Sequence, residues 1–171
     1  AASNRSGPAA PSPSGRRIAP RFRASLAFNA QTREARRSIR EAPARLNTLL
    51  DQAEVAVGEG DIAQASLIHE QAEAIRTQIE EAQDRINEVA NDLSSQEEFQ
   101  PAEAQITSLR DQALAMPAVL ECQTLLTALG DVESRAQARL DQRRQEERNQ
   151  AARGAFNERL NEQASRQARA R

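Results

Sequence analysis

Apolar residues recur at alternating steps of four and three between residues 68 and 93, which is the spacing of a coiled-coil seam. The seam consists of Ile68, Ala72, Ile75, Ile79, Ala82, Ile86, Val89 and Leu93. A row that covers more than three heptads predicts one long amphipathic helix. Because its apolar face needs cover, we expect helical partners along the 68–93 seam, either from this chain or from another protein.

A second apolar row precedes the seam and also keeps to one helical face. It consists of Leu46, Leu50, Ala53 and Val57. The row stops at Gly58-Glu59-Gly60, which signals a helix end and a turn, and Asp61 is placed to cap the next helix. So short a turn predicts an antiparallel helical hairpin over residues 30–94. Pro43 should kink or restart its first helix.

The remainder of the chain also shows helical signals. Residues 95–130 predict short helices, one over 101–115 and one over 117–129, with Gly130 as the stop. Asp131 would then cap a long helix over 131–171, which is nearly all Arg, Glu, Gln and Ala. A helix this polar is exposed to solvent or ordered on a partner.

Residues 1–29 have a different composition, with four Pro, two Gly, five Ser and five Arg but no acid. Such a stretch buries too little apolar surface to fold, and it predicts a disordered basic arm. The same composition is also typical of organelle transit peptides. The expected fold is therefore all-α, with a disordered N-terminus, a hairpin with a coiled-coil-like seam, short helices and a long polar C-terminal helix.

The composition excludes most catalytic and metal chemistry. Aromatic residues make up 2% of the chain, Lys, Trp and Tyr are absent, and Cys122 and His69 are each the single residue of their type. Two potential ligands fall short of a structural zinc site, and no catalytic cluster is present, so we expect neither an enzyme nor a cofactor. Cys122 suits a small buried hydrophobe and His69 a surface position. No apolar run approaches ~18 residues, so we expect no membrane contact.

Charge is sorted into three blocks. Residues 1–45 hold ten Arg and two Glu, residues 46–132 three Arg and seventeen acids, and residues 133–171 ten Arg and six acids. Within the last block, five Arg recur at about four-residue steps and mark a candidate RNA-contact face, because Arg suits bidentate phosphate binding. They are Arg135, Arg139, Arg143, Arg144 and Arg148. Interleaved acids favour an ordinary solvated face instead, and no aromatic lies among these Arg to stack on bases.

The hairpin region resembles the LUC-seven-like family, the "lethal unless cap-binding complex" splicing proteins. Residues 49–76 read LLDQAEVAVGEGDIAQASLIHEQAEAIR, which aligns without a gap with a family motif like LLxxAExLGEEGDVDEAQxLxxExExLK. The matching positions are Leu49, Leu50, Ala53, Glu54, Glu59, Gly60, Asp61, Ile62, Ala65, Ile68, Glu70, Glu73, Ile75 and Arg76.

Residues 119–145, VLECQTLLTALGDVESRAQARLDQRRQ, resemble the zinc finger that follows this hairpin in the family. The similar positions are Cys122, Leu125 or Leu126, Gly130, Asp131, Ser134, Arg135 and Leu140. Of the four metal ligands only Cys122 remains, because Val119, Arg139 and Gln145 lie at or near the other positions. A zinc ion cannot bind there, so we expect helix in place of a finger.

The resemblance implies an RNA-associated, non-enzymatic component of the U1 snRNP that helps to select 5′ splice sites in the nucleus. Its RNA partner would be U1 RNA or the 5′ splice site. The alternative, from the seam and the transit-like N-terminus, is a coiled-coil scaffold or assembly protein, in an organelle and without a nucleic-acid role.

Overall fold

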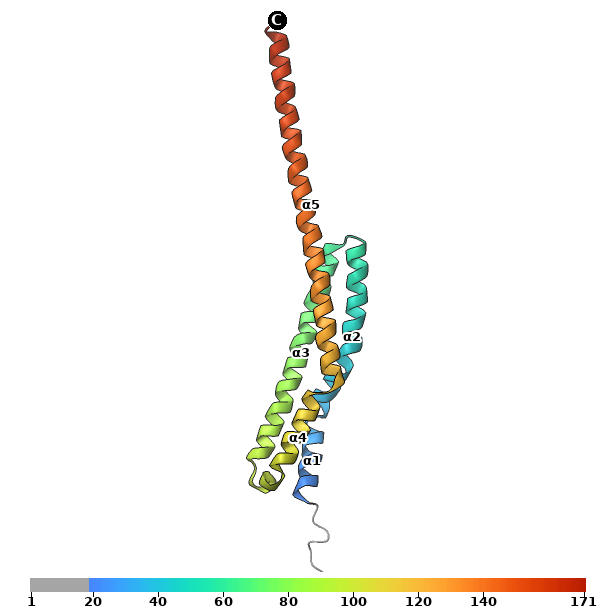
Figure 1. Cartoon of the computed structure of the whole chain (residues 1–171), viewed down its shortest axis with the longest axis vertical. Helices are drawn as coiled ribbons and strands as arrows, with labels where there is room; N and C mark the ends of the chain where they lie inside the picture. The colour runs from blue at the N-terminus through green and yellow to red at the C-terminus, as the bar shows by residue number, and fades with distance from the viewer. Residues whose placement is uncertain (1–18) are drawn as a thin grey trace, which may run out of the picture. The chain divides into compact units, whose positions relative to one another are not determined.

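The computed structural model describes residues 19–171, and this part of the chain is helical without strands. The elements are α1 (Pro20–Gln31), α2 (Arg33–Gly58), α3 (Ile62–Ser95), a 3-10 helix η2 (Glu97–Ala102), α4 (Glu103–Leu114) and α5 (Pro117–Arg169) (Figure 1). The all-α class and the long C-terminal helix are confirmed.

The chain divides into two compact units. Unit 1 holds the described residues up to Glu41 together with Gln78–Leu120, and unit 2 holds Ala42–Thr77 and Glu121–Arg171. Helices α2, α3 and α5 each contribute to both units. All eight predicted seam residues of α3 are buried. The seam is therefore covered within this chain, and a helical protein partner would have to bind another surface.

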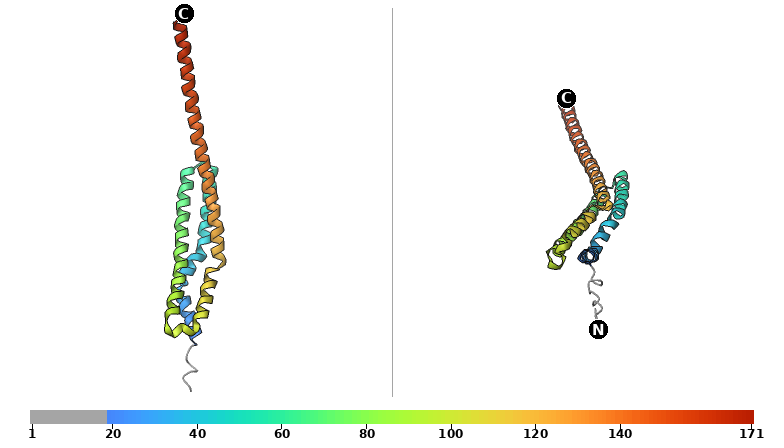
Figure 2. Two further views of the ribbon diagram at one scale, coloured as in Figure 1. Left: turned by 60° about the vertical axis from the view of Figure 1, so that its left-hand side comes forward. Right: turned by 60° about the horizontal axis from the view of Figure 1, so that its bottom comes forward.

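The core of unit 1 forms around the second half of the α3 seam. The α3 residues Ala82, Ile86, Val89, Ala90 and Leu93 form one buried cluster with Ala24, Phe28, Ala35, Ile39, Phe99, Ala102, Ile106, Ala113 and Val119. Figure 2 shows α1, α4 and this half of α3 side by side. Two polar contacts join α1 to the segment after α3: Arg23 pairs with Glu98 at 3.6 Å, and Gln105 Nε2 donates to Ser25 Oγ at 3.4 Å.

Helix α1 corrects the predicted disordered arm. Residues 1–18 of that arm lie outside the described residues, but Pro20–Gln31 is a helix. Pro20 occupies its first turn, where the missing amide hydrogen has no intrahelical partner to lose. Ala24 and Phe28, four residues apart, are fully buried in the core of unit 1. Because these two apolar residues lie one turn apart on one helical face, they anchor the segment in the core and order it as a helix, which its composition alone does not suggest.

Unit 2 contains the hairpin end of α2 and α3 together with α5. Its buried apolar residues are Ala42, Leu46, Leu49, Ala53, Ala56, Val57, Ile62, Ala65, Ile68, Ala72, Ile75, Cys122, Leu126, Leu129, Val132 and Ala136. The predicted Leu50 is only half-buried, and its neighbour Leu49 takes the core position. The apolar row of α2 therefore contains Leu46, Ala53 and Val57 as predicted, with Leu49 in place of Leu50.

The turn between α2 and α3 is a Schellman motif. Gly60 adopts a positive φ of 75°, the Asp61 N–H donates to Ala56 O at 2.8 Å, and the Gly60 N–H donates to Val57 O at 3.1 Å. Asp61 Oδ1 accepts from the Gln64 N–H at 3.0 Å and caps α3. The predicted turn residues are thus placed as expected, with Gly58 as the last residue of α2.

Three predicted helix boundaries are wrong. Helix α5 continues through Gly130, so Asp131 caps no new helix; of the two alternatives at Pro43, a kink or a restart, the restart is wrong because α2 is continuous there. Buried Leu129 and Val132 flank Gly130, and their packing offsets the ~1 kcal/mol that Gly costs a helix. After α3 ends at Ser95 as expected, η2 has no side-chain cap, and it takes up the first two residues of the helix predicted over 101–115.

A substitution in the seam tests this packing. Ile79→Asp places an unpaired carboxylate at a buried position, so we expect a lower thermal midpoint and a loss of several kcal/mol in the free energy of unfolding. Glu80→Asp introduces the same side chain at an exposed neighbouring position and should leave stability unchanged. Equal far-UV circular dichroism melting curves for the two variants would contradict the seam assignment.

Candidate anion-binding surfaces

Two of the five predicted RNA-contact residues donate hydrogen bonds to the hairpin turn. The Arg139 Nη1 group donates to Val57 O at the end of α2, and Arg143 Nη2 donates to Gly60 O at 3.1 Å. The last carbonyls of a helix lack intrahelical donors and carry partial negative charge, which favours a cation there. Both side chains therefore contribute a structural bond between α5 and the turn of unit 2.

The other three predicted residues have different surroundings. Arg135 Nη2 is 3.9 Å from Glu54 Oε1 of α2. Arg144 and Arg148 line a groove on α5 together with Asp141, Glu147 and Ala151. Its two acids offset its two Arg, so it has no excess of positive charge. The structure therefore does not bring the predicted five together as one basic face.

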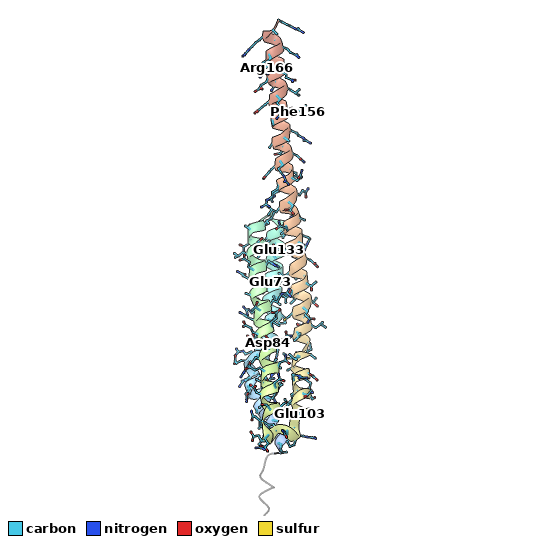
Figure 3. The ribbon with its side chains drawn as sticks, turned by 90° about the vertical axis from the view of Figure 1, so that its left-hand side faces the viewer. Glu73, Asp84, Glu103, Glu133, Phe156 and Arg166 are labelled. Carbon is cyan, nitrogen blue, oxygen red and sulfur yellow. The ribbon has the colours of Figure 1, made fainter. Side chains whose placement is uncertain are left out.

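The last part of α5 extends beyond the hairpin of unit 2. All residues from 141 to 171 are exposed, and Figure 3 shows Phe156 and Arg166 on a stretch with no helix beside it. The helix is supported there by side-chain contacts one turn apart, such as Gln142 Nε2 to Glu146 Oε1 at 3.3 Å. Such pairs stabilise a helix by only ~0.2–0.5 kcal/mol each.

A denser basic cluster lies in unit 1, where the sequence had suggested only a general excess of Arg. The cluster is Arg33, Arg36, Arg37 and Arg40 at the start of α2, and we call it the arginine groove. With these four, the residues Leu26, Asn29, Ala30 and Glu41 line a groove of about 800 Å³. The positions i, i+3, i+4 and i+7 place four guanidinium groups on one face of a helix.

Arg36 is held in place by the junction of α1 and α2. Its Nε donates to Thr32 Oγ1 at 3.1 Å, and its Nη2 donates to Asn29 O at 2.9 Å. Thr32 is fully buried, and its hydroxyl donates to Phe28 O at 2.7 Å. These bonds satisfy carbonyls at the end of α1 and fix the guanidinium of Arg36 at the centre of the groove.

Positive charge in the arginine groove is only partly compensated. Burial lowers the pKa of Arg36, and the neighbouring charges of Arg40 and Arg33 lower it further. Glu41 accepts a hydrogen bond from Arg37 at 2.8 Å and raises the pKa of that residue. Within residues 19–171, the side chains of Arg33 and Arg40 make no hydrogen bond or ion pair. An anion in the groove would relieve this repulsion, which makes it the stronger candidate site.

The sequence contains a signal for the arginine groove that charge counting overlooks. Ten Arg of the first block were counted together, and five of them belong to the Pro-rich arm. Only the helical spacing of Arg33, Arg36, Arg37 and Arg40 separates an ordered face from that total. The α5 Arg residues have similar spacing. What distinguishes them is that two of them bond to the hairpin turn and that acids lie beside two others, and only the fold shows these contacts.

The structure places Cys122 in a core and His69 at the surface. Cys122 is buried in unit 2, and burial, followed by the charge of Glu121, raises the pKa of its thiol. His69 is partly exposed at the surface of α3, with its Nε2 4.0 Å from Glu73 Oε1. In the described part of the chain, no three His, Cys, Asp or Glu side chains form a metal-binding group.

One described stretch meets a simple test for a membrane helix. It lies within Glu97–Arg169 and is long and apolar enough to cross a membrane, by length and composition only. Core helices of soluble proteins pass the same test of length and composition. The absence of membrane contact therefore stays a prediction.

No protein-family model, curated protein or solved structure matches this chain. The resemblance to the LUC-seven-like family stays a prediction based on the residues quoted above.

The two roles of the α5 Arg residues give a direct prediction. Replacing Arg139 and Arg143 together by Ala should lower the free energy of unfolding, by about 1 kcal/mol for each hydrogen bond lost, and speed amide exchange around the turn. Replacing Arg144 and Arg148 by Ala should change neither quantity. If both pairs destabilise equally, the turn contacts do not hold α5 to the hairpin.

Cys122 provides a probe of unit 2. Its raised pKa leaves less thiolate at pH 8, and its burial blocks access, so iodoacetamide should label it far more slowly than it labels the unfolded chain. Intact-mass spectrometry in buffer and in guanidinium chloride measures the two rates. Equal rates would mean that Cys122 is not buried.

Proposed function

We propose that this chain is a non-enzymatic RNA-associated protein that binds the phosphate backbone through the arginine groove. The observation that carries the proposal is the convergence of four guanidinium groups on one groove at the start of α2. Arg presents planar paired donors to phosphate and stays charged at any physiological pH. An electrostatic footprint of this kind is the usual basis of affinity for nucleic acid.

The arrangement of the groove favours an extended anion over a single small one. From Arg33 to Arg40 the helix rises about 10 Å, because each residue adds about 1.5 Å. Glu41 neutralises part of the charge of Arg37, so the uncompensated groups are spread along the groove instead of being gathered at one point. Successive phosphates of one RNA strand match this distribution.

The resemblance to LUC-seven-like proteins gives the proposal its biological setting. It supports association with the U1 snRNP and a contribution to 5′ splice-site selection in the nucleus. Its best-matched positions include Gly60 and Asp61, which form the hairpin turn. In place of the zinc finger, residues 119–145 belong to the uninterrupted helix α5, so the RNA contact is assigned to the arginine groove.

A second candidate function is a helical scaffold or assembly protein in an organelle, without a nucleic-acid role. It is favoured by the exposed end of α5, where Phe156 and Leu160 leave 61% and 47% of their surface uncovered. A scaffold of this kind would bind protein and show no salt-dependent affinity for RNA. Localisation of a tagged full-length protein separates the settings, because nuclear speckles fit the splicing role and an organelle fits the alternative.

RNA binding by the full chain tests the proposal. We expect affinity for a 5′ splice-site RNA oligonucleotide to fall linearly on a logarithmic plot against salt concentration. Replacing Arg33, Arg37 and Arg40 by Gln should weaken binding and reduce the salt slope by about 2, since each lost phosphate contact removes ~0.7. Arg36 is retained because it holds the α1–α2 junction.

The matched control removes the same charge from α5, by changing Arg144, Arg148 and Arg153 to Gln. These three residues are exposed, and their loss should leave the slope close to that of the parent chain. Binding that is absent or independent of salt would contradict the proposal. Equal losses in both triple variants would show that total charge, not the groove, determines affinity.

A further inference from the structure

An exposed apolar pair lies along the same helical face as the arginine groove. Leu26 of α1 lines the groove and is 50% exposed. Phe22 precedes it by one helical turn, so its ring lies on the same face of α1, and it is 56% exposed. Apolar surface and guanidinium groups therefore follow one another along α1 and the start of α2 within unit 1.

The rest of α1 explains why Phe22 remains outside. Ala24 and Phe28 occupy the buried face of this helix, and Arg23 is tied to Glu98. With that face packed in the core of unit 1, rotation of α1 cannot bury Phe22. The ring is thus held on the surface by a fixed helix next to a groove of uncompensated positive charge.

We propose that Phe22 is a base-stacking platform and that the arginine groove with Phe22 binds single-stranded RNA. This inference rests on the proposed function and adds the strandedness of the ligand. Aromatic rings that accompany a basic groove stack on unpaired bases with little regard to sequence, while the cations follow the backbone. Bases inside a duplex are stacked on one another and cannot reach such a ring.

The composition of the surface favours RNA over an anionic membrane. A helix that lies in a membrane interface inserts a long apolar face. Here Ala24 and Phe28 of α1 are committed to the core, and the large apolar side chains left exposed on α1 are Phe22 and Leu26, among the polar Arg21, Arg23 and Asn29. Two side chains on one turn suit a nucleobase better than a bilayer.

A single-Trp variant makes the stacking directly visible. The chain has no Trp and no Tyr, so Phe22→Trp introduces its only strong fluorophore. Phe156→Trp is the matched control, because Phe156 is similarly exposed but lies on α5. We expect a twelve-nucleotide oligouridylate to quench the fluorescence of the full-length Phe22→Trp variant and to leave that of the Phe156→Trp variant unchanged.

Binding measurements then separate the possible ligands. Phe22→Ala should weaken oligouridylate binding about tenfold, as loss of one stacked base does, and should leave binding of inorganic polyphosphate unchanged. Phe156→Ala should change neither. Because Phe22 is outside the core, far-UV circular dichroism should be the same for the two Ala variants.

Several outcomes would overturn the inference. One is quenching of the Phe22→Trp variant by a twelve-base-pair RNA duplex or by polyphosphate that equals the quenching by oligouridylate. Another is an unchanged affinity of the Phe22→Ala variant for oligouridylate. A third is that the Phe22→Ala variant loses affinity only for phosphatidylserine vesicles. If Phe22→Ala binds oligouridylate normally while the Arg33, Arg37 and Arg40 variant does not, stacking fails and phosphate binding stands. If neither variant loses affinity, the proposed function fails as well.

Discussion

The burial of one apolar row along α3 is the constraint on which the rest of the structure depends. Its eight residues are covered in both units, and each unit builds its core on the part of the row that it contains. In unit 1 the row packs with α1 and α4, and in unit 2 it lies with the part of α2 from Ala42 and the part of α5 from Glu121. Because these helices are fixed by burial, their outward faces are fixed too, and the arginine groove is one of those faces.

Much of the fold follows from local patterns in the sequence. The seam spacing predicts α3, and Gly60 with Asp61 predicts the turn, because one position needs a positive φ and the next a capping carboxylate. The boundaries at Gly130 and in the N-terminal arm could not be predicted this way. Leu129 and Val132 keep α5 continuous, and Phe28 orders α1, through tertiary burial that a window of composition does not contain.

The candidate site was the harder part to predict, because Arg serves two purposes in this chain. Arg139 and Arg143 donate hydrogen bonds to carbonyl oxygens at the hairpin turn, so their guanidinium groups stabilise the packing of α5 on the hairpin. Arg33 and Arg40 have no partner within the described residues, so their charge is available to a ligand. Both sets have helical spacing, and only the position of the opposing carbonyls and acids separates them. The same fold presents Phe22 on the helical face that leads to the groove, whereas no aromatic lies among the predicted Arg residues of α5.

Photo-cross-linking with mass spectrometry tests the central claim most directly. The full chain would be irradiated with a single-stranded RNA that carries 4-thiouridine, and the cross-linked residues would be identified. The account predicts cross-links between residues 19 and 41, at Phe22 and around the arginine groove. Cross-links confined to residues 131–171 would contradict it, because they would place the RNA on α5 and leave the groove without a ligand.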